Sequence, residues 1–178
     1  MVRVYVGVSL VLMTIMIGCT GVPDGFKPVE NFEIERYLGK WYEIARLDHK
    51  FERDMSNVSA TYTANDSGDI TVVNRGYKVK TDEWKSIQGK ARPVGNENTG
   101  SLKVSFFGPF YGGYHIIDLD QQTYSYAMVV GPSRSYFWIL SRDKVVDPQL
   151  FDELVSRAGG MGIDTKKLIL VEQNLPEG

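Results

Sequence analysis

Apolar and polar residues alternate over short stretches through most of this chain, and clusters of turn residues separate the stretches. In residues 101–106, for example, Leu102, Val104 and Phe106 lie on one face of an extended chain, with polar residues between them. Such alternation predicts antiparallel strands with one buried face. The predicted strands are residues 41–46, 58–63, 70–77, 84–91, 101–106, 114–119, 124–130 and 136–141.

Helical spacing of apolar residues flanks these strands. Residues 31–38 show it before Gly39, which predicts a short helical turn leading into the first strand. After the last long strand, Asp147 and Pro148 suit an N-cap and a first helical position, and the apolar stripe that follows ends at Gly159. The meander therefore predicts an all-β fold: an eight-stranded antiparallel up-and-down β-barrel, or calyx, with a C-terminal α-helix packed on its wall.

The first residues differ from the rest. Arg3 precedes an apolar run of fourteen residues, which is short for a membrane span and typical of a secretory signal. Gly18 then precedes Cys19, as in bacterial lipoprotein signals, where the cysteine becomes the lipidated N-terminus. A plain signal peptide that happens to contain a cysteine is the alternative. We expect a lipoprotein signal peptide at residues 1–18, a lipidated N-terminus and tether at 19–30, and the barrel domain at 31–178.

Cysteine content and charge narrow the function classes. Cys19 is the only cysteine of the 178 residues, so neither an intramolecular disulfide nor a cysteine-based metal site can form. The formal net charge is −2 and no run of basic residues occurs, so a nucleic-acid partner is not expected.

Patterns of catalytic and metal-binding residues are also missing from the sequence. Gly-x-Ser-x-Gly does not occur, and the single thiol is the expected anchor. His49 and His115 are the only histidines, and His115 lacks a second ligand for a metal or haem. We therefore predict a protein that is not an enzyme and has no metal site or cofactor. Haem or small-metabolite sensing through His115 is a minor alternative.

Three separate segments resemble the signature motifs of lipocalins. They are Gly-Lys-Trp at residues 39–41, the turn at 119–124, where Leu119 replaces the family's Thr, and Leu-Ser-Arg at 140–142. Their order agrees with the predicted strands. The resemblance implies that an arginine packs over a tryptophan and seals one barrel end through a cation–π contact. The barrel-closing residues implied are Gly39, Trp41 and Arg142.

Residues 41–46 and 104–114 are most similar to the bacterial, outer-membrane lipoprotein members of this family. That resemblance implies binding of a lysophospholipid or a fatty acid such as palmitate, for storage or transport in envelope maintenance or stress. Thr20 follows the cysteine in place of the Asp that commonly retains lipoproteins in the inner membrane. We therefore expect a lipid anchor in the outer membrane of a Gram-negative bacterium, with the domain facing the periplasm.

The candidate ligand site follows from the strands and the loops at the open end. Aromatic strand residues and one loop cation are the expected ligand-binding residues: Trp84, Phe106, Tyr114, Trp138 and Arg53. Further cations that would suit a lipid head group are Lys78, Lys80 and Arg134. Glu43 alternates with Trp41, so it should point inward and need a buried partner, without which its pKa would rise.

An aromatic loop between the fifth and sixth strands is the most unusual feature of the chain. Phe107, Phe110 and Tyr111 should lie at the barrel mouth, where they would contact the acyl chain, a membrane or a second subunit, unless they fold back under a neighbouring loop. A homodimer is thus one expected partner. The alternative function is a structural or interaction lipoprotein whose aromatic loop docks a partner or pairs two copies.

Overall fold

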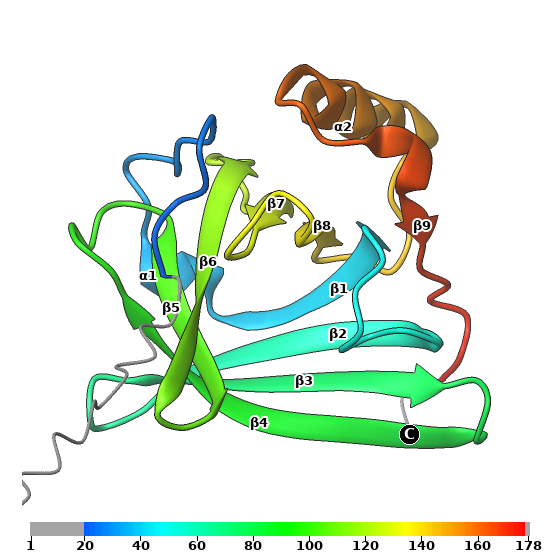
Figure 1. The fold of residues 1–178 in the computed structure, drawn as a ribbon, viewed down its shortest axis with the longest axis horizontal. Coiled ribbons are helices and arrows are strands. Elements are labelled where there is room, and N and C mark those ends of the chain that lie inside the picture. The colour runs from blue at the N-terminus through cyan, green and yellow to red at the C-terminus, as the bar shows by residue number, and fades with distance from the viewer. Residues whose placement is uncertain (1–19, 177–178) are drawn as a thin grey trace, which may run out of the picture.

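The computed structural model describes residues 20–176, so the expected signal peptide at 1–18 and Cys19 lie outside the described residues. The described chain forms a closed antiparallel β-barrel, which confirms the predicted fold class (Figure 1). Its eight barrel strands are β1 (Gly39–Arg46), β2 (Met55–Ala64), β3 (Ile70–Lys78), β4 (Glu83–Pro93), β5 (Ser101–Phe107), β6 (Phe110–Leu119), β7 (Tyr126–Val130) and β8 (Phe137–Ser141).

Consecutive strands pair as neighbours from β2 to β8, and β1 closes the ring by pairing with both β2 and β8. Trp41 lies opposite Ala60 of β2, and Tyr42 lies opposite Ser141 of β8. A short strand, β9 (Ile169–Leu170), adds to β1. Closure leaves no unpaired edge between β1 and β8.

The sixth strand is longer than predicted because it begins at Phe110, not at residue 114. Two adjacent glycines made residues 110–113 look like a loop. Pairing with β5, where Gly113 lies opposite Lys103, extends the strand despite the poor strand propensity of glycine. Another glycine, Gly89 of β4, is needed for close approach, since a Cβ there would lie 2.5 Å from the Ser105 carbonyl oxygen.

The two α-helices lie where the sequence predicts them. The first, α1 (Ile34–Tyr37), precedes β1, and the second, α2 (Pro148–Gly160), begins after Asp147, whose carboxylate accepts hydrogen bonds from the backbone N–H groups of Gln149 and Leu150. In α2, Leu154 and Ala158 are fully buried against the outer wall of β7 and β8. A 3₁₀ turn, η1 (Thr165–Lys167), follows. Within the part of the chain described, no helix has the length and apolar character needed to cross a bilayer.

The expected tether is docked on the barrel over its described residues. Its first part contacts the β7–β8 loop: Arg134 donates to the Asp24 carbonyl and lies 5.2 Å from the centre of the Phe26 ring. Its last part hydrogen-bonds to the wall, because Val29 donates to the Ile116 carbonyl and accepts from the Gly100 N–H. Residues 20–30 therefore form a fixed strap on the outer surface.

The barrel end that carries α1 is closed by aromatic packing and by Arg142. The Arg142 guanidinium lies 3.9 Å from the Trp41 ring centre, the contact implied by the family resemblance. It also donates to the backbone carbonyls of Arg36, Lys40 and Tyr124. One planar cation thus joins α1, β1 and the β6–β7 turn.

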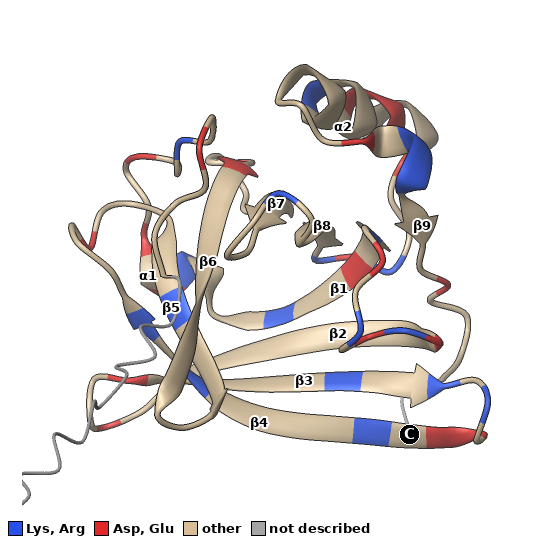
Figure 2. Cartoon of the chain, viewed as in Figure 1, with Lys and Arg blue, Asp and Glu red and all other residues tan. Residues whose placement is uncertain are grey.

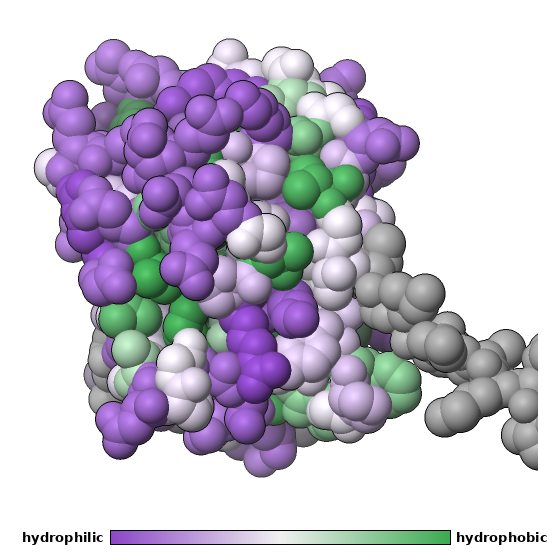
Figure 3. Space-filling model, turned by 90° about the vertical axis from the view of Figure 1, so that its left-hand side faces the viewer, coloured by the Kyte–Doolittle hydropathy of each residue, from purple (hydrophilic) through white to green (hydrophobic). Residues whose placement is uncertain are grey.

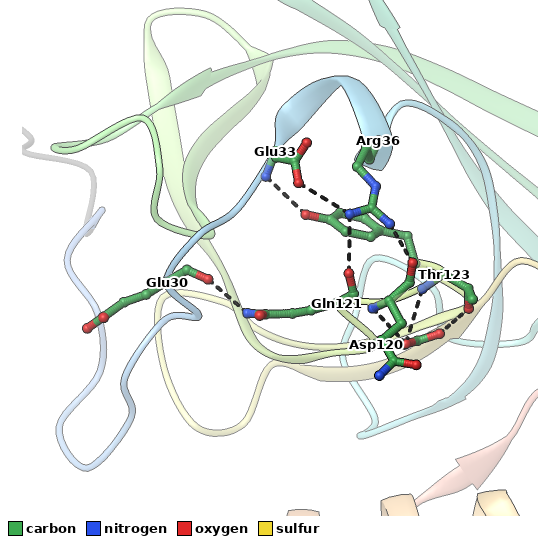
Figure 4. Close-up of polar contacts among 8 residues, drawn as sticks. Glu30, Glu33, Arg36, Asp120, Gln121 and Thr123 are labelled. Atoms are coloured by element: carbon green, nitrogen blue, oxygen red, sulfur yellow. Dashed lines mark hydrogen bonds and ion pairs between the residues drawn. The ribbon is translucent and has the colours of Figure 1, made fainter.

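A second polar network holds the β6–β7 turn against α1 (Figure 4). Arg36 donates to the carbonyls of Gln121 and Gln122 and stacks 4.1 Å from the Tyr124 ring centre. Within the turn, Asp120 accepts hydrogen bonds from Thr123 and Ser125. These bonds outweigh its partial burial and hold the pKa of Asp120 well below the ordinary value.

Charged residues of both signs are interspersed over the barrel, without a large single-sign area on the visible strands (Figure 2). Figure 3 looks onto the end that carries α1, where most of the surface is hydrophilic and apolar side chains form smaller areas. This end therefore presents a water-facing cap. The apolar opening of the barrel lies elsewhere.

Substituting Arg142 tests the closed end. We expect Arg142→Met to lower the free energy of unfolding by about 2–4 kcal/mol, because three carbonyls lose a charged donor and Trp41 loses its cation. Urea denaturation measures the loss. The control Arg142→Lys should have a free energy of unfolding between those of the wild type and the Met variant, because an ammonium group keeps the charge but cannot donate to three carbonyls in one plane. Equal stability of the Met variant would contradict this role.

Candidate ligand-binding cavity

A cavity of about 670 Å³ occupies the barrel interior. Its walls are mainly apolar, and it extends to the loops that join β1 to β2, β5 to β6 and β7 to β8. We define the mouth as the lining residues of these three connections together with their strand ends: His49, Phe51, Glu52, Phe107, Phe110, Pro132 and Tyr136. An eight-stranded barrel with such an interior has room for one small ligand.

Three of the predicted ligand residues line this cavity: Phe106, Tyr114 and Trp138. Trp84 does not, and its expected role is corrected. Trp84 lies on the outer wall, where its ring packs 4.2 Å from the Arg75 guanidinium carbon and edge-on against Tyr77. Alternation along β4 explains the error, because the neighbouring Lys85 faces the interior.

The cations chosen for a head group lie outside the cavity lining, so this expectation also changes. Arg53 makes a two-pronged ion pair with Asp48, and Lys80 pairs with Asp54 at 2.7 Å. Arg134 holds the strap. The cation that does line the cavity is Lys85, whereas the Arg75 guanidinium lies over Trp84 on the outer wall.

The aromatic loop divides between the mouth and the outer wall. Phe107 and Phe110 line the mouth and remain 69% and 53% exposed. Tyr111 points to the outer side of β6, where Lys103 lies 5.2 Å from its ring centre. The phenylalanines therefore have no covering element within the described chain, contrary to a loop folded back under its neighbour.

Tyr62 and Tyr114 line the floor of the cavity, next to the fully buried Tyr37. The Tyr114 hydroxyl lies 2.7 Å from that of Tyr37 and 2.8 Å from that of Tyr62. Tyr37 also stacks beside Trp41, with ring centres 4.7 Å apart, and this connects the floor to the sealed end. Burial raises the pKa of all three hydroxyls, so the floor is uncharged at neutral pH.

A charged cluster interrupts the apolar wall between the floor and the mouth. Glu43 is 3% exposed and pairs with Arg46, which is 2% exposed, at 2.8 Å. Glu52 lies beside Glu43 and receives the Trp138 indole N–H, while the His49 Nε2 atom lies 3.0 Å from it. The inward direction of Glu43 and the presence of a buried partner agree with the sequence-based expectation.

The pKa values of the two carboxyl groups in this cluster are shifted in opposite directions. Burial, together with the nearby charge of Glu52, raises the pKa of Glu43 well above its ordinary value. Burial acts on Glu52 as well, but the adjacent His49 ring and the hydrogen bond from the Trp138 indole outweigh it and lower the pKa of Glu52. Glu43 is thus the protonated member of the pair. His49 and Glu52 were not predicted, because residues 47–56 have no periodicity that would show which side chains turn inward.

His115 lies in the outer wall and does not face the cavity. It is fully buried, and its Nε2 donates to the Gly21 carbonyl of the strap. Since a carbonyl can only accept, the Nδ1 atom accepts from the Ser101 hydroxyl at 2.7 Å. Burial lowers the pKa of this imidazole. Among residues 20–176, no three side chains of the ligating types cluster as a metal site would require.

The fold, the cavity and the Trp41–Arg142 seal together match one known family. Residues 32–173 match the family model described as a lipocalin-like domain. The chain belongs to the lipocalin family. This family binds and transports small molecules in its barrel.

Several relatives are similar over most of this lipocalin. It is 48% identical over 167 residues to the outer membrane lipoprotein Blc of Vibrio cholerae, covering 93% of this chain and 98% of the relative. The Blc protein of Escherichia coli K12 is 47% identical, with 85% of each chain covered. Temperature-induced lipocalin-1 of Arabidopsis thaliana is 35% identical over 79% of this chain and 78% of its own length.

Solved structures show the same fold at lower identity. Insecticyanin from the tobacco hornworm Manduca sexta superposes with a TM-score of 0.68 at 21% identity, covering 86% of this chain and 87% of that one. At this identity the likeness establishes the barrel architecture alone.

The raised pKa of Glu43 makes stability depend on pH. The unfolded chain releases this proton above about pH 4.5 and the folded chain holds it, so stability from this group is lost as pH rises from there toward the folded pKa. We expect the free energy of unfolding of Glu43→Gln, relative to that of the wild type, to increase by up to about 1.4 kcal/mol per pH unit within this window. Urea denaturation from pH 4 to 8 measures the difference. The exposed control Glu35→Gln should run parallel to the wild type, and a parallel Glu43→Gln curve would contradict the assignment.

Proposed function

We propose that this lipocalin is an outer-membrane lipoprotein that holds one single-chain amphiphile, a lysophospholipid or a fatty acid, in its barrel. The mainly apolar 670 Å³ cavity that opens at one end carries the proposal. The similarity of this chain to relatives named outer membrane lipoprotein Blc supports an outer-membrane location. The expected lipid anchor at Cys19 belongs to the same proposal, as do the periplasmic orientation and a role in envelope maintenance or stress.

Burial of an acyl chain is sufficient to drive binding. Each shielded methylene contributes about 0.8 kcal/mol, so about ten of them give roughly 8 kcal/mol. Part of this is lost to association, and affinities in the micromolar range or tighter remain. The chain would lie between the wall residues Val72, Val104 and Leu140, and its methyl end would approach the tyrosine floor.

The polar end of the ligand would then remain near the mouth. The lining groups that can meet a head group there are Lys85 of β4 and the carboxylate of Glu52. Lys85 is half exposed and lies 2.8 Å from Glu83, so it can reach a phosphate without leaving a buried charge. A zwitterionic head group suits a mouth that offers both signs.

Binding itself is tested with residues 20–178, delipidated and shown to be folded by circular dichroism. Equilibrium dialysis should give saturable one-to-one binding of radiolabelled palmitate and palmitoyl-lysophosphatidylethanolamine. The variant Val104→Trp should weaken binding of both ligands at least tenfold. Val104 faces the cavity opposite Gly112, so a larger side chain would occupy the space of the acyl chain. The outer-wall control Lys90→Trp should bind normally. Absence of saturable binding to the folded wild type would reject the lipid-carrier function in favour of an interaction protein.

Head-group selection is tested at Lys85. We expect Lys85→Gln to weaken binding of the lysophospholipid about threefold, which is the size of a partly exposed ion pair. Binding of monopalmitoylglycerol should be unchanged. Lys80→Gln is the matched control, because Lys80 lies nearby outside the cavity lining and is paired with Asp54. Dialysis with both ligands measures the ratio. An equal loss for both ligands would mean that Lys85 acts through the cavity's shape and not through the phosphate.

A further inference from the structure

The strap fixes where a lipid anchor would leave the barrel. Gly21 accepts a hydrogen bond from the buried His115 of β6, and the Thr20 carbonyl lies so close to Gly113 that a Cβ there would be 3.3 Å away. Only Thr20 separates Cys19 from this attachment. Thr20, the residue that follows Cys19 in the sequence, therefore lies against the outer face of β6.

This exit point belongs to the mouth half of the barrel. Gly113 lies three residues from Phe110, which is about 10 Å along a strand. The next part of the strap, at Asp24 and Phe26, is held by Arg134 of the β7–β8 loop, which borders the mouth. Only from Val29 onward does the strap run toward the closed end.

Exposed apolar side chains gather at the same end. Three of the eight phenylalanines are exposed, namely Phe51, Phe107 and Phe110, and all three line the mouth. Cations accompany aromatic rings here, since Lys50 lies 5.4 Å from the Phe51 ring centre and Lys103 lies beside Tyr111. Exposed phenyl rings next to lysine and tyrosine suit the boundary between acyl chains and head groups of a bilayer.

We propose that the mouth of this lipocalin rests on the membrane that carries its anchor, with Phe107 and Phe110 inserted among the lipids and the cavity opening toward the bilayer. The inference depends on the proposed anchor at Cys19 but not on the identity of the ligand. A bilayer is favoured over a second copy because the docked strap brings the anchor itself to this end of the molecule.

The test uses the full lipidated protein in vesicles of phosphatidylethanolamine and phosphatidylglycerol at a three-to-one ratio. Lipidation blocks Cys19, so an added cysteine is the only free thiol. An environment-sensitive nitrobenzoxadiazole label is placed in Phe110→Cys, or in the control Val145→Cys, which is 82% exposed beyond the closed-end terminus of β8. We expect nitroxide lipids to quench the first label at least threefold more than the second, and aqueous iodide to do the reverse.

Each other outcome has a definite meaning. Equal iodide access at both positions would overturn the docked mouth. Protection at position 110 that disappears on dilution of the protein in the vesicles would assign this surface to a second copy. Failure of the protein to join the vesicles would reject the anchor and this inference with it, while the dialysis result for the ligand would stand.

A variant with an inserted linker distinguishes the contribution of the strap to membrane orientation from that of the mouth phenylalanines. Ten Gly-Ser residues inserted after Thr20 leave the remaining strap contacts in place but free the anchor from β6. We expect lipid quenching at position 110 to fall at least threefold. Unchanged quenching would show that the strap does not orient the barrel.

Discussion

Pairing of β1 with both β2 and β8 is the constraint on which the rest of the structure depends. Because the ring of hydrogen bonds closes there, every strand must present alternate residues to an interior that is too wide to be filled by side chains alone. The register is then secured at one end, where Arg142 binds carbonyls of α1, β1 and the β6–β7 turn. A barrel sealed at one end only must leave its remaining volume accessible from the other, and the cavity follows from this asymmetry.

The same closure explains why a charged cluster can exist in the wall. Glu43 faces inward by alternation with Trp41, and the register shift between Glu43 and Ala45 leaves Arg46 within 2.8 Å of it. Burying a carboxyl group is costly. Here the cost is reduced because Glu43 is protonated and because Glu52 accepts a hydrogen bond from Trp138 and lies next to His49. The cluster fastens the β1–β2 loop to the barrel, and that loop forms one side of the mouth.

Much of this architecture could be predicted because the side-chain period of a strand is two and its signal is local. The sequence places Phe106, Tyr114 and Trp138 on strands, and all three line the cavity, but it did not establish which strand aromatics face the interior. The signal that excludes Trp84 was nevertheless present in the sequence. Ile87, which lines the cavity, and the buried Ala91 mark the interior face of the same strand, and Trp84 is out of phase with both. The strap and the cluster partners could not be predicted, because they depend on contacts between residues far apart in the sequence, such as Gly21 with His115 and Trp138 with Glu52.

The position of the strap has a consequence for how such a barrel would receive a ligand. A single-chain amphiphile is poorly soluble and resides mostly in membranes, so its path into the cavity is limited by its exit from the bilayer. A cavity that opened away from the bilayer would require each acyl chain to cross water, at a cost that grows by about 0.8 kcal/mol with every exposed methylene. The position of Thr20 beside Gly113, the exposed phenyl rings of the mouth and the hydrophilic closed end would all reduce that exposure if Cys19 carries the proposed anchor. In this arrangement the strap is part of the ligand's route, because it sets which end of the barrel meets the lipid.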